Sequence, residues 1–177
     1  MKSTVSFVLL FITVVVFSNA QTQGAWSMPK QEIVFKDDQG EIAKMWVDPG
    51  FRYADIQYEG RSYRMFYNRN NPKLKQARIV DNDSKLQIGK GRGNLSWGSG
   101  KFVFINGEEV NLRQKNNPNG YEIIGPYGTL FKVENHAVSP VKTYQETDFL
   151  AQAFFLFRRI KSTQIPPTEV IMLVTSY

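Results

Sequence analysis

The sequence of 177 residues contains no cysteine and only one histidine. The lack of cysteine excludes disulfide frameworks, thiolate catalysis, cysteine-ligated zinc and iron–sulfur clusters. A single imidazole, His136, excludes any site that needs two or more histidines, and no G-x-S-x-G nucleophile elbow accompanies it for a catalytic triad. These absences predict a protein that is not an enzyme and that uses neither a metal nor a cofactor.

Acidic residues are also poorly placed for catalysis. Two adjacent pairs, Asp37 with Asp38 and Glu108 with Glu109, lie beside predicted turns, where charged side chains are expected for solvation. A glycosidase needs two carboxylates about 5 to 10 Å apart across a cleft, which turn positions do not indicate. A secreted hydrolase stays an alternative, and it would need clustered acids or His136 in a cleft.

The N-terminus has the pattern of a secretory signal peptide. Lys2 precedes an apolar run from Phe7 to Phe17, and small residues stand at Ser18 and Ala20, the two positions that a signal peptidase reads. The run of about eleven residues is shorter than the roughly 20 needed to span a bilayer. We therefore predict cleavage near Ala20, a mature chain without a transmembrane segment, and a secreted or periplasmic location.

The charge balance is basic, with a formal net charge of +6. We expect residues 21–177 to form a single domain, because roughly 150 residues can bury enough surface to be stable without disulfides. A basic domain favours anionic partners, and export from the cell argues against nucleic acid. The expected partner is an anionic lipid or a component of the cell envelope. Two glycosylation sequons, at Asn82 and Asn94, would matter only in a eukaryotic secretory route.

Short runs rich in Val, Ile, Tyr and Phe recur between residues 32 and 133, each closed by turn-forming residues. In one run Tyr63, Met65 and Tyr67 occupy every second position, which is typical of a half-buried strand. The runs are 33–36, 41–47, 52–58, 62–68, 77–80, 86–88, 102–105, 108–113, 121–124 and 129–133, with a last one at 169–175. The fold class predicted is mainly β, an antiparallel β-barrel of about 10–12 strands.

Two segments between these strands stand out. Asn106-Gly107, flanked by alternating runs, predicts a hairpin with a two-residue type I′ turn. Residues 89–101 are rich in glycine and are interpreted as a flexible loop between strands. This loop lacks the G-x-x-x-x-G-K-[ST] spacing of a phosphate-binding loop, but its glycines, cations and one indole would suit an anionic ligand. The candidate ligand-binding residues are Lys90, Arg92, Trp97 and Lys101.

A single helix is predicted over about residues 144–162. Thr143 and Glu146 have the spacing of a capping box at its start. Apolar residues cover nearly the whole circumference of the following turns, with Gln152 as the interruption, so the helix is expected to be buried on all sides. The economical surround is the strand meander itself, closed into a barrel about one buried hydrophobic C-terminal helix.

This architecture resembles the tubby C-terminal-like superfamily, which includes the LURP-one-related proteins and the phospholipid scramblases. The helix segment from Thr147 to Ile160 is similar to the last helix of that group, and the segment from Tyr121 to Leu130 is similar to its recurring hairpins. The resemblance is architectural. It implies a small barrel without an enzymatic site, whose relatives bind phosphoinositides or act at membranes, and no phosphoinositide-binding residue is carried over to this chain.

Other basic residues have structural interpretations. Arg158, Arg159 and Lys161 lie where cations stabilise a helix C-terminus, with binding of a partner as the alternative. Six further cations could form a basic and aromatic face, although a solvated face is the plainer interpretation. They are Arg61, Arg64, Arg69, Lys73, Lys75 and Arg78.

The sequence therefore predicts a secreted, non-enzymatic binding module for anionic or membrane-surface ligands. One alternative is a lipocalin-type carrier of small apolar ligands, which would need an open interior beside the helix. Another is a structural or adhesive protein of the cell envelope. Whether the segment from Phe149 to Ile160 lies inside the sheet and leaves a cavity discriminates between the first two.

Overall fold

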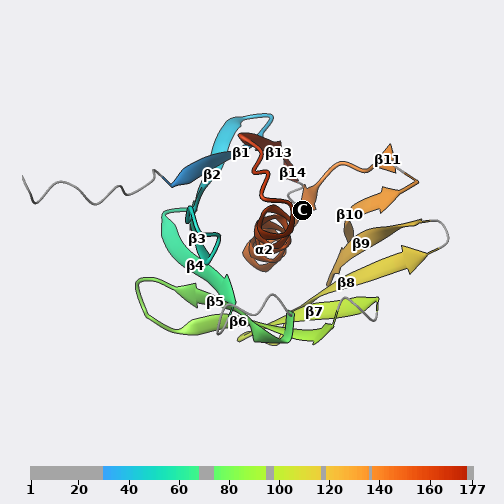
Figure 1. Ribbon diagram of the computed structural model, residues 1–177, viewed down its shortest axis with the longest axis horizontal. Helices are drawn as coiled ribbons and strands as arrows, with labels where there is room; N and C mark the ends of the chain where they lie inside the picture. Colours follow the sequence, from blue (N-terminus) through green and yellow to red (C-terminus); the bar gives the residue numbers. More distant parts are fainter. Residues whose placement is uncertain (1–29, 68–73, 95–97, 117–118, 136, 175–177) are drawn as a thin grey trace, which may run out of the picture.

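The computed structural model describes residues 30–67, 74–94, 98–116, 119–135 and 137–174. The signal peptide predicted at residues 1–20, together with Trp97 and His136, lies outside the described residues. The described chain is mainly β with one α-helix (Figure 1). This agrees with the secondary structure predicted from the sequence.

The strands follow one another at short intervals. The first half contains β1 (Gln31–Asp37), β2 (Gly40–Val47), β3 (Tyr53–Tyr58), β4 (Arg61–Tyr67), a 3-10 turn η2 (Leu74–Gln76), β5 (Ala77–Asp81), β6 (Gln87–Asn94) and β7 (Ser99–Phe104). The second half contains β8 (Glu109–Asn116), β9 (Asn119–Gly125), β10 (Gly128–Glu134), β11 (Ala137–Val138), β12 (Lys142–Thr143), the helix α2 (Glu146–Thr163), β13 (Glu169–Ile171) and β14 (Leu173–Val174).

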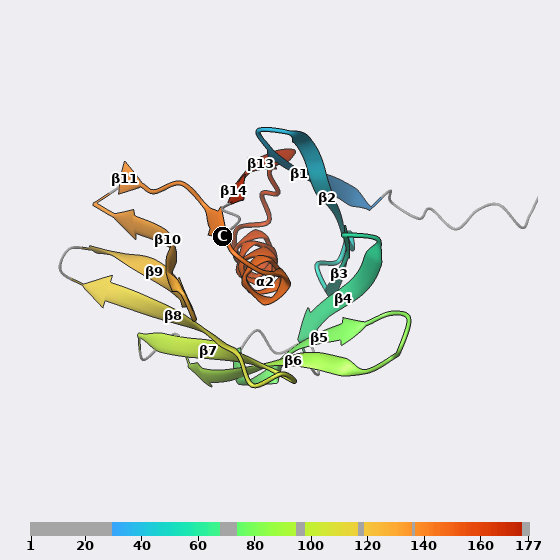
Figure 2. The same cartoon turned by 180° about the vertical axis from the view of Figure 1, so that it is seen from behind.

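Twelve of these strands form one curled sheet around α2 (Figures 1 and 2). Strands β1 to β11 lie in the sheet in the order of the sequence, each antiparallel to the next, and β13 pairs in parallel with β1. Over the described residues the edge strands β11 and β13 do not pair with each other. The sheet is therefore open, and the closure of a barrel that the sequence predicted is not confirmed.

A second, two-stranded sheet lies at this opening. It pairs β12 with β14 in parallel, with Lys142 opposite Leu173 and Thr143 opposite Val174. Strand β12 comes soon after the edge strand β11, and β14 comes directly after the other edge strand, β13. The small sheet thus links the two edges of the large one without joining its ladder.

The hydrophobic core lies between the helix and the concave face of the sheet. The apolar circumference of α2 predicts that the helix is buried in this way. Phe149 stacks on Tyr58 with ring centroids 4.0 Å apart, and Phe154 lies 4.6 Å from Phe102 and 5.2 Å from Tyr67. Each fully buried side chain of this size contributes about 1.5 to 3 kcal/mol to the free energy of unfolding. These contacts hold the helix against the half of the sheet that runs from β1 to β7.

The start of the helix differs from the predicted capping box. The N-cap residue is Gln145, which makes no side-chain cap hydrogen bond. Thr143 is held in β12 by its pairing with β14, and its buried hydroxyl has no hydrogen-bond partner among the described residues. A carboxylate oxygen of Asp148 accepts instead from the backbone N–H of Tyr144, at 3.4 Å. Tertiary pairing has therefore overridden the local cap signal.

Over its described residues the glycine-rich segment is strand rather than flexible loop, apart from Gly98, which lies in a turn. Lys90 and Arg92 belong to β6 and Lys101 belongs to β7. Gly91 is required there by close packing, because a Cβ atom at this position would collide with the carbonyl oxygen of Leu74. Glycine in this run thus marks the close approach of η2 to the sheet.

The hairpin at Asn106-Gly107 forms, but its turn is not type I′. That turn needs positive φ at both central residues, and only Gly107 has it, with φ of 87°. Phe104 exchanges backbone hydrogen bonds with Glu108 and Gly107, which gives a longer loop with glycine in the left-handed region. Positive φ at two successive residues occurs instead at Glu59 (48°) and Gly60 (76°), between β3 and β4.

Candidate functional site

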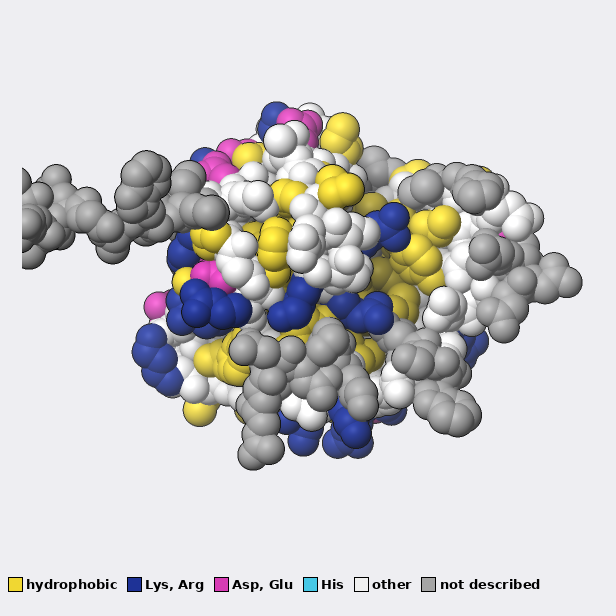
Figure 3. All heavy atoms as spheres, viewed as in Figure 1, with side chains coloured by type: hydrophobic (Ala, Val, Ile, Leu, Met, Phe, Trp, Pro, Cys, Tyr) yellow, Lys and Arg dark blue, Asp and Glu magenta, His cyan; other side chains and the backbone are white. Residues whose placement is uncertain are grey.

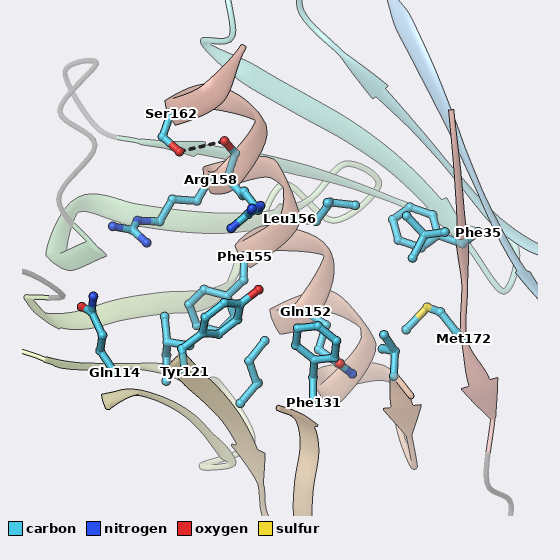
Figure 4. A pocket seen from close by; sticks show the side chains of 15 residues that line it. Phe35, Gln114, Tyr121, Phe131, Gln152, Phe155, Leu156, Arg158, Ser162 and Met172 are labelled. Atoms are coloured by element: carbon cyan, nitrogen blue, oxygen red, sulfur yellow. Dashed lines mark hydrogen bonds between the residues drawn. The ribbon is translucent and has the colours of Figure 1, made fainter. Parts of the chain in front are cut away.

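A cavity of about 540 Å³ lies beside α2, on the side that faces β8, β9, β10 and the opening of the sheet (Figure 4). This volume is in the range of small-molecule sites. Fifteen described residues line it: Phe35, Leu112, Gln114, Tyr121, Ile123, Phe131, Val141, Gln152, Phe155, Leu156, Arg158, Arg159, Ser162, Val170 and Met172. The sheet curls around the helix, and the helix does not fill all the space on the concave side of the sheet.

Different faces of α2 pack against the sheet and line the cavity. Its largest aromatic side chains pack toward β3, β4 and β7, as the ring contacts of Phe149 and Phe154 show. The cavity is lined by a second stripe, in which Gln152, Phe155 and Arg159 recur at intervals of three or four residues. One face of the helix anchors it, and the other face forms a wall of the cavity.

Most of the cavity wall is apolar. Inward positions of the neighbouring strands β8 and β9 supply Leu112 and Ile123, and the rings of Tyr121 and Phe131 lie 5.8 Å apart. Met172 closes the wall next to the opening of the sheet. Such a lining favours an alkyl chain or another apolar group that leaves water.

Positive charge is concentrated at one end of the cavity. Arg158 and Arg159 belong to the last turns of α2, and none of the fifteen lining residues is acidic. Across the described residues, neither guanidinium forms an ion pair with a carboxylate. Seen as in Figure 1, several Lys and Arg side chains lie beside hydrophobic side chains near the middle of this face (Figure 3).

Tyr121 and Arg159 are close enough to interact electrostatically. Burial raises the pKa of the Tyr121 hydroxyl, and the positive charge of Arg159 opposes this shift. Ser162, one turn along the helix, donates its hydroxyl to the carbonyl oxygen of Arg159 at 2.8 Å (dashed in Figure 4). This bond engages the backbone of Arg159 and not its guanidinium.

Gln152 brings a polar group into the apolar part of the cavity. The side chain is only 7% exposed, and its Nε2 donates a hydrogen bond to the carbonyl oxygen of Lys142 at 2.8 Å. Its Oε1 has no hydrogen-bond partner among the described residues. The bond to Lys142 orients the amide, and Oε1 has almost no accessible surface, so this acceptor is packed within the protein and is not presented to the cavity.

A buried carboxyl lies one turn before Gln152. Asp148 is fully buried, and this burial, with a smaller contribution from Glu108, raises its pKa from 3.8 to about 6. Glu108 itself accepts a hydrogen bond from the hydroxyl of Thr147 at 2.6 Å. Asp148 does not line the cavity, so we interpret it as part of the packing of the helix N-terminus.

A charged cluster fastens the same end of the helix to the sheet. Arg61 on β4 donates to Asp81 at 2.7 Å and to Glu146 at 2.9 Å, and the hydroxyl of Tyr63 also donates to Glu146. The Arg61 guanidinium, helped by backbone N–H groups, lowers the pKa of Asp81 from 3.8 to about 2. The cluster positions α2 and takes no part in the cavity.

The residues predicted as a ligand site do not meet at this cavity. Lys90 and Arg92 are exposed on the outer face of β6, because the buried Gly89 and Gly91 take the inward positions between them. Lys101, opposite Arg92 in the ladder, forms an ion pair with Glu109 at 2.6 Å. The fourth predicted residue, Trp97, lies outside the described residues.

A shallow hollow does occur on that outer face. Its volume is about 220 Å³, and Arg92, Lys101 and Arg113 from three successive strands are among its lining residues. The structure thus brings two of the four predicted residues together, with Arg113 as an unpredicted third cation. None of them contributes to the larger cavity.

The residues of the larger cavity were only partly visible in the sequence. In the sequence, Arg158 and Arg159 indicate helix charges, with partner binding as the alternative interpretation. Gln152 interrupts an apolar helix, and this interruption is the one local signal of a polar group in the interior. Tyr121 and Phe131 carried no signal beyond that of ordinary strand residues.

Two negative observations apply to the described part of the chain. It contains no group of three or more His, Asp or Glu side chains arranged to hold a metal ion. It also has no helix with the length and apolar character needed to cross a bilayer.

Comparison with protein-family models, with curated proteins and with solved structures finds no match for this chain. The resemblance to the tubby C-terminal-like superfamily stays a prediction.

Proposed function

We propose that the protein is a secreted, non-enzymatic binding module for a small amphipathic anion, such as a long-chain fatty acid. The apolar chain of the ligand would lie in the cavity between α2 and strands β8 to β10, and its anionic group would meet Arg158 and Arg159. The observation that carries the proposal is a cavity of about 540 Å³ with an apolar wall and two arginines but no acidic residue in its lining. The proposal combines two predictions from the sequence, a binding module for anionic ligands and a carrier of small apolar ligands.

The energetics favour such a ligand over a purely polar anion. Burying ten methylene groups would contribute about 8 kcal/mol, at roughly 0.8 kcal/mol each. Hydrogen bonds between a carboxylate and an arginine add about 1.5 to 3 kcal/mol each. Association itself costs of the order of 4 to 15 kcal/mol. Burial of the apolar chain offsets most of this cost, and the arginines select the head group.

The proposal is tested by displacement of a fluorescent fatty acid from the purified protein. We expect dodecanoate to compete in the micromolar range, and dodecanol to compete at least tenfold less well because it has no charge for the arginines. The double substitution R158Q/R159Q should remove this preference. L156W, which places an indole in the cavity, should abolish binding of both compounds.

A matched control uses cations that lie outside the cavity. R92Q/R113Q removes the same amount of positive charge from the outer face of β6 and β8 and should leave the displacement curves unchanged. Failure of every fatty acid to displace the probe, or an equal loss of binding in R92Q/R113Q and R158Q/R159Q, would contradict the proposal.

A second candidate function is the binding of an anionic membrane surface by the outer face. It is favoured by the hollow of about 220 Å³ that Arg92, Lys101 and Arg113 help to line. Flotation with vesicles containing anionic phospholipid should then show binding at low salt that is lost at high salt, because exposed charges are screened. R92Q/R113Q should lose this binding, and R158Q/R159Q should keep it.

A further inference from the structure

We infer that the protein exchanges its ligand directly with an anionic membrane, on which the end of the molecule around the cavity mouth docks. This inference rests on the proposed function, because it concerns the route by which the amphipathic ligand reaches the cavity. The docking end is the one at which α2 ends. It differs from the hollow on the outer face of β6 to β8.

The mouth of the cavity lies at the docking end. Among the described lining residues only Gln114, Arg159 and Ser162 are exposed, and the others are buried or half-buried. Gln114 belongs to the last part of β8, and the other two belong to the last turns of α2. A ligand that enters from outside the protein therefore passes the C-terminal end of the helix.

The position of the docking end follows from the topology. Neighbouring strands of the large sheet from β1 to β11 are antiparallel, so their turns alternate between two ends of the molecule. Lys161 donates through Nζ to the carbonyl oxygen of Phe51, in the turn between β2 and β3, at 2.9 Å. The end of α2 therefore lies with this turn and with the connection between β4 and β5 that contains η2.

The docking end is basic. Five cations lie there that take part in none of the ion pairs among the described residues: Lys75, Arg78, Arg158, Arg159 and Lys161. Its acidic side chains Asp48, Glu122 and Glu134 are each paired with a cation. The last turns of α2 face the viewer in Figure 1, and in the same view Lys and Arg side chains gather near the middle of the surface (Figure 3). This end therefore attracts an anionic partner.

An exposed aliphatic side chain at the same end favours a membrane over a soluble polyanion. Ile165 is 76% exposed and directly follows Gln164, the residue that ends the helix. Surfaces that bind a bilayer combine cations, which meet anionic head groups, with apolar groups that enter the interface. A soluble polyanion offers no apolar environment for Ile165.

The opposite end of the molecule is acidic. Asp38, Glu59, Asp83 and Glu108 lie in or beside the turns that close the hairpins β1–β2, β3–β4, β5–β6 and β7–β8. The hydrogen bond from Thr147 to Glu108 places the start of α2 at this end. An anionic membrane repels this end and attracts the other, so the charge asymmetry turns the cavity mouth toward the bilayer.

The experiment measures transfer of a fluorescent fatty acid from the loaded protein to vesicles that contain a quencher. Transfer through water does not depend on vesicle concentration, whereas transfer during contact rises in proportion to it. We expect this rise with vesicles of phosphatidylcholine containing about a quarter phosphatidylglycerol. At low salt the rate should be at least fivefold higher than with phosphatidylcholine alone, and high salt should remove the difference.

A matched pair of variants locates the docking surface. K75Q/I165S removes one exposed cation and the exposed aliphatic side chain of the docking end, and neither residue lines the cavity. It should lower the transfer rate to anionic vesicles about fivefold and leave the affinity for the fatty acid unchanged. K85Q/I105S makes the same two changes at the acidic end, where Ile105 is 73% exposed, and should transfer like the wild type.

The possible outcomes separate the inference from the proposed function. A transfer rate that does not depend on vesicle concentration, with the fatty acid still bound by the protein, overturns the inference and leaves the proposed function intact. An equal loss of rate in the two variants, or a loss only in R92Q/R113Q, shows that another surface docks and also overturns the inference. The absence of any fatty acid binding overturns both.

Discussion

A Cβ atom added at Gly125 would lie 2.5 Å from Oδ1 of Asp148. The buried carboxyl thus occupies the space that a side chain at the end of β9 would need. Gly125 is required here by this packing, which connects the second half of the sheet to the first turn of the helix.

We expect G125A to lower the free energy of unfolding by about 2 kcal/mol, because the methyl group must displace a buried side chain. Urea denaturation would measure this loss. In a D148A background the carboxyl is gone, so the same substitution should cost less than half as much. Equal losses in the two backgrounds would show that Asp148 is not what excludes a side chain at Gly125.

The raised pKa of Asp148 predicts a pH dependence of stability. Its pKa is about 6 in the folded protein and 3.8 for the unperturbed group, so the folded state binds the proton more tightly. The free energy of unfolding should therefore fall as the pH rises from about 4 to about 6, by roughly 3 kcal/mol for this group. D148N keeps an acceptor for the backbone of Tyr144 and should be more stable than the wild type at pH 7.

Denaturation curves of the wild type and D148N between pH 4 and pH 7 test this. The difference between the two proteins should grow across that range in favour of D148N. Groups other than Glu108, which interacts with Asp148, should titrate alike in the two proteins and cancel from the comparison. Parallel curves would mean that Asp148 ionises in the folded protein as readily as in the unfolded chain.

The Arg61 cluster predicts a shift in the opposite direction at lower pH. Asp81 has a pKa lowered to about 2, mainly by Arg61, so its contribution to stability is present above about pH 4 and lost as the pH falls toward 2. R61Q should move the pKa of Asp81 back toward 3.8, as measured by NMR titration of its carboxyl carbon. R64Q, which removes a neighbouring arginine that pairs with Asp55, should leave the pKa of Asp81 unchanged.

Close packing at Gly91 gives a further prediction. A Cβ atom there would collide with the backbone of Leu74 and lie 3.0 Å from the Cβ of Ala77. G91A should therefore lower the free energy of unfolding by about 3 kcal/mol or prevent folding, since backbone atoms cannot move aside cheaply. K90A, at the exposed neighbouring position, should change it by less than about 0.5 kcal/mol. A harmless G91A would show that η2 does not pack closely against β6.

Local patterns predicted the elements well and their assembly less well. Alternation at Tyr63, Met65 and Tyr67 and the apolar turns of α2 reflect burial directly, and the corresponding strand and helix are present. The closure of a barrel was not predictable in this way. It depends on which strand meets the edge of β1, and here β13 takes that place in parallel pairing.

The candidate site shows the same limit. Lys90, Arg92 and Lys101 lie in a segment of unusual composition, which predicts a ligand site, but the direction in which these side chains point depends on Gly89 and Gly91 facing inward. The larger cavity depends on the distance between one face of the helix and three strands, which no local signal reports. Interruption of the apolar helix by a polar residue, as at Gln152, was the one pattern that pointed to the interior.

The pairing of β1 with β13 also has a consequence for the order of folding. Val34 lies opposite Glu169, so the ladder joins the first and nearly the last described strands of the chain. Contacts between residues so distant in sequence carry a large loop-closure entropy and form slowly. The hairpins from β1 to β11 are local and can form early. The pairing of β1 with β13 can form only when nearly the whole chain is available. Val170 of β13 lines the cavity, so the cavity should be the last part of the molecule to form.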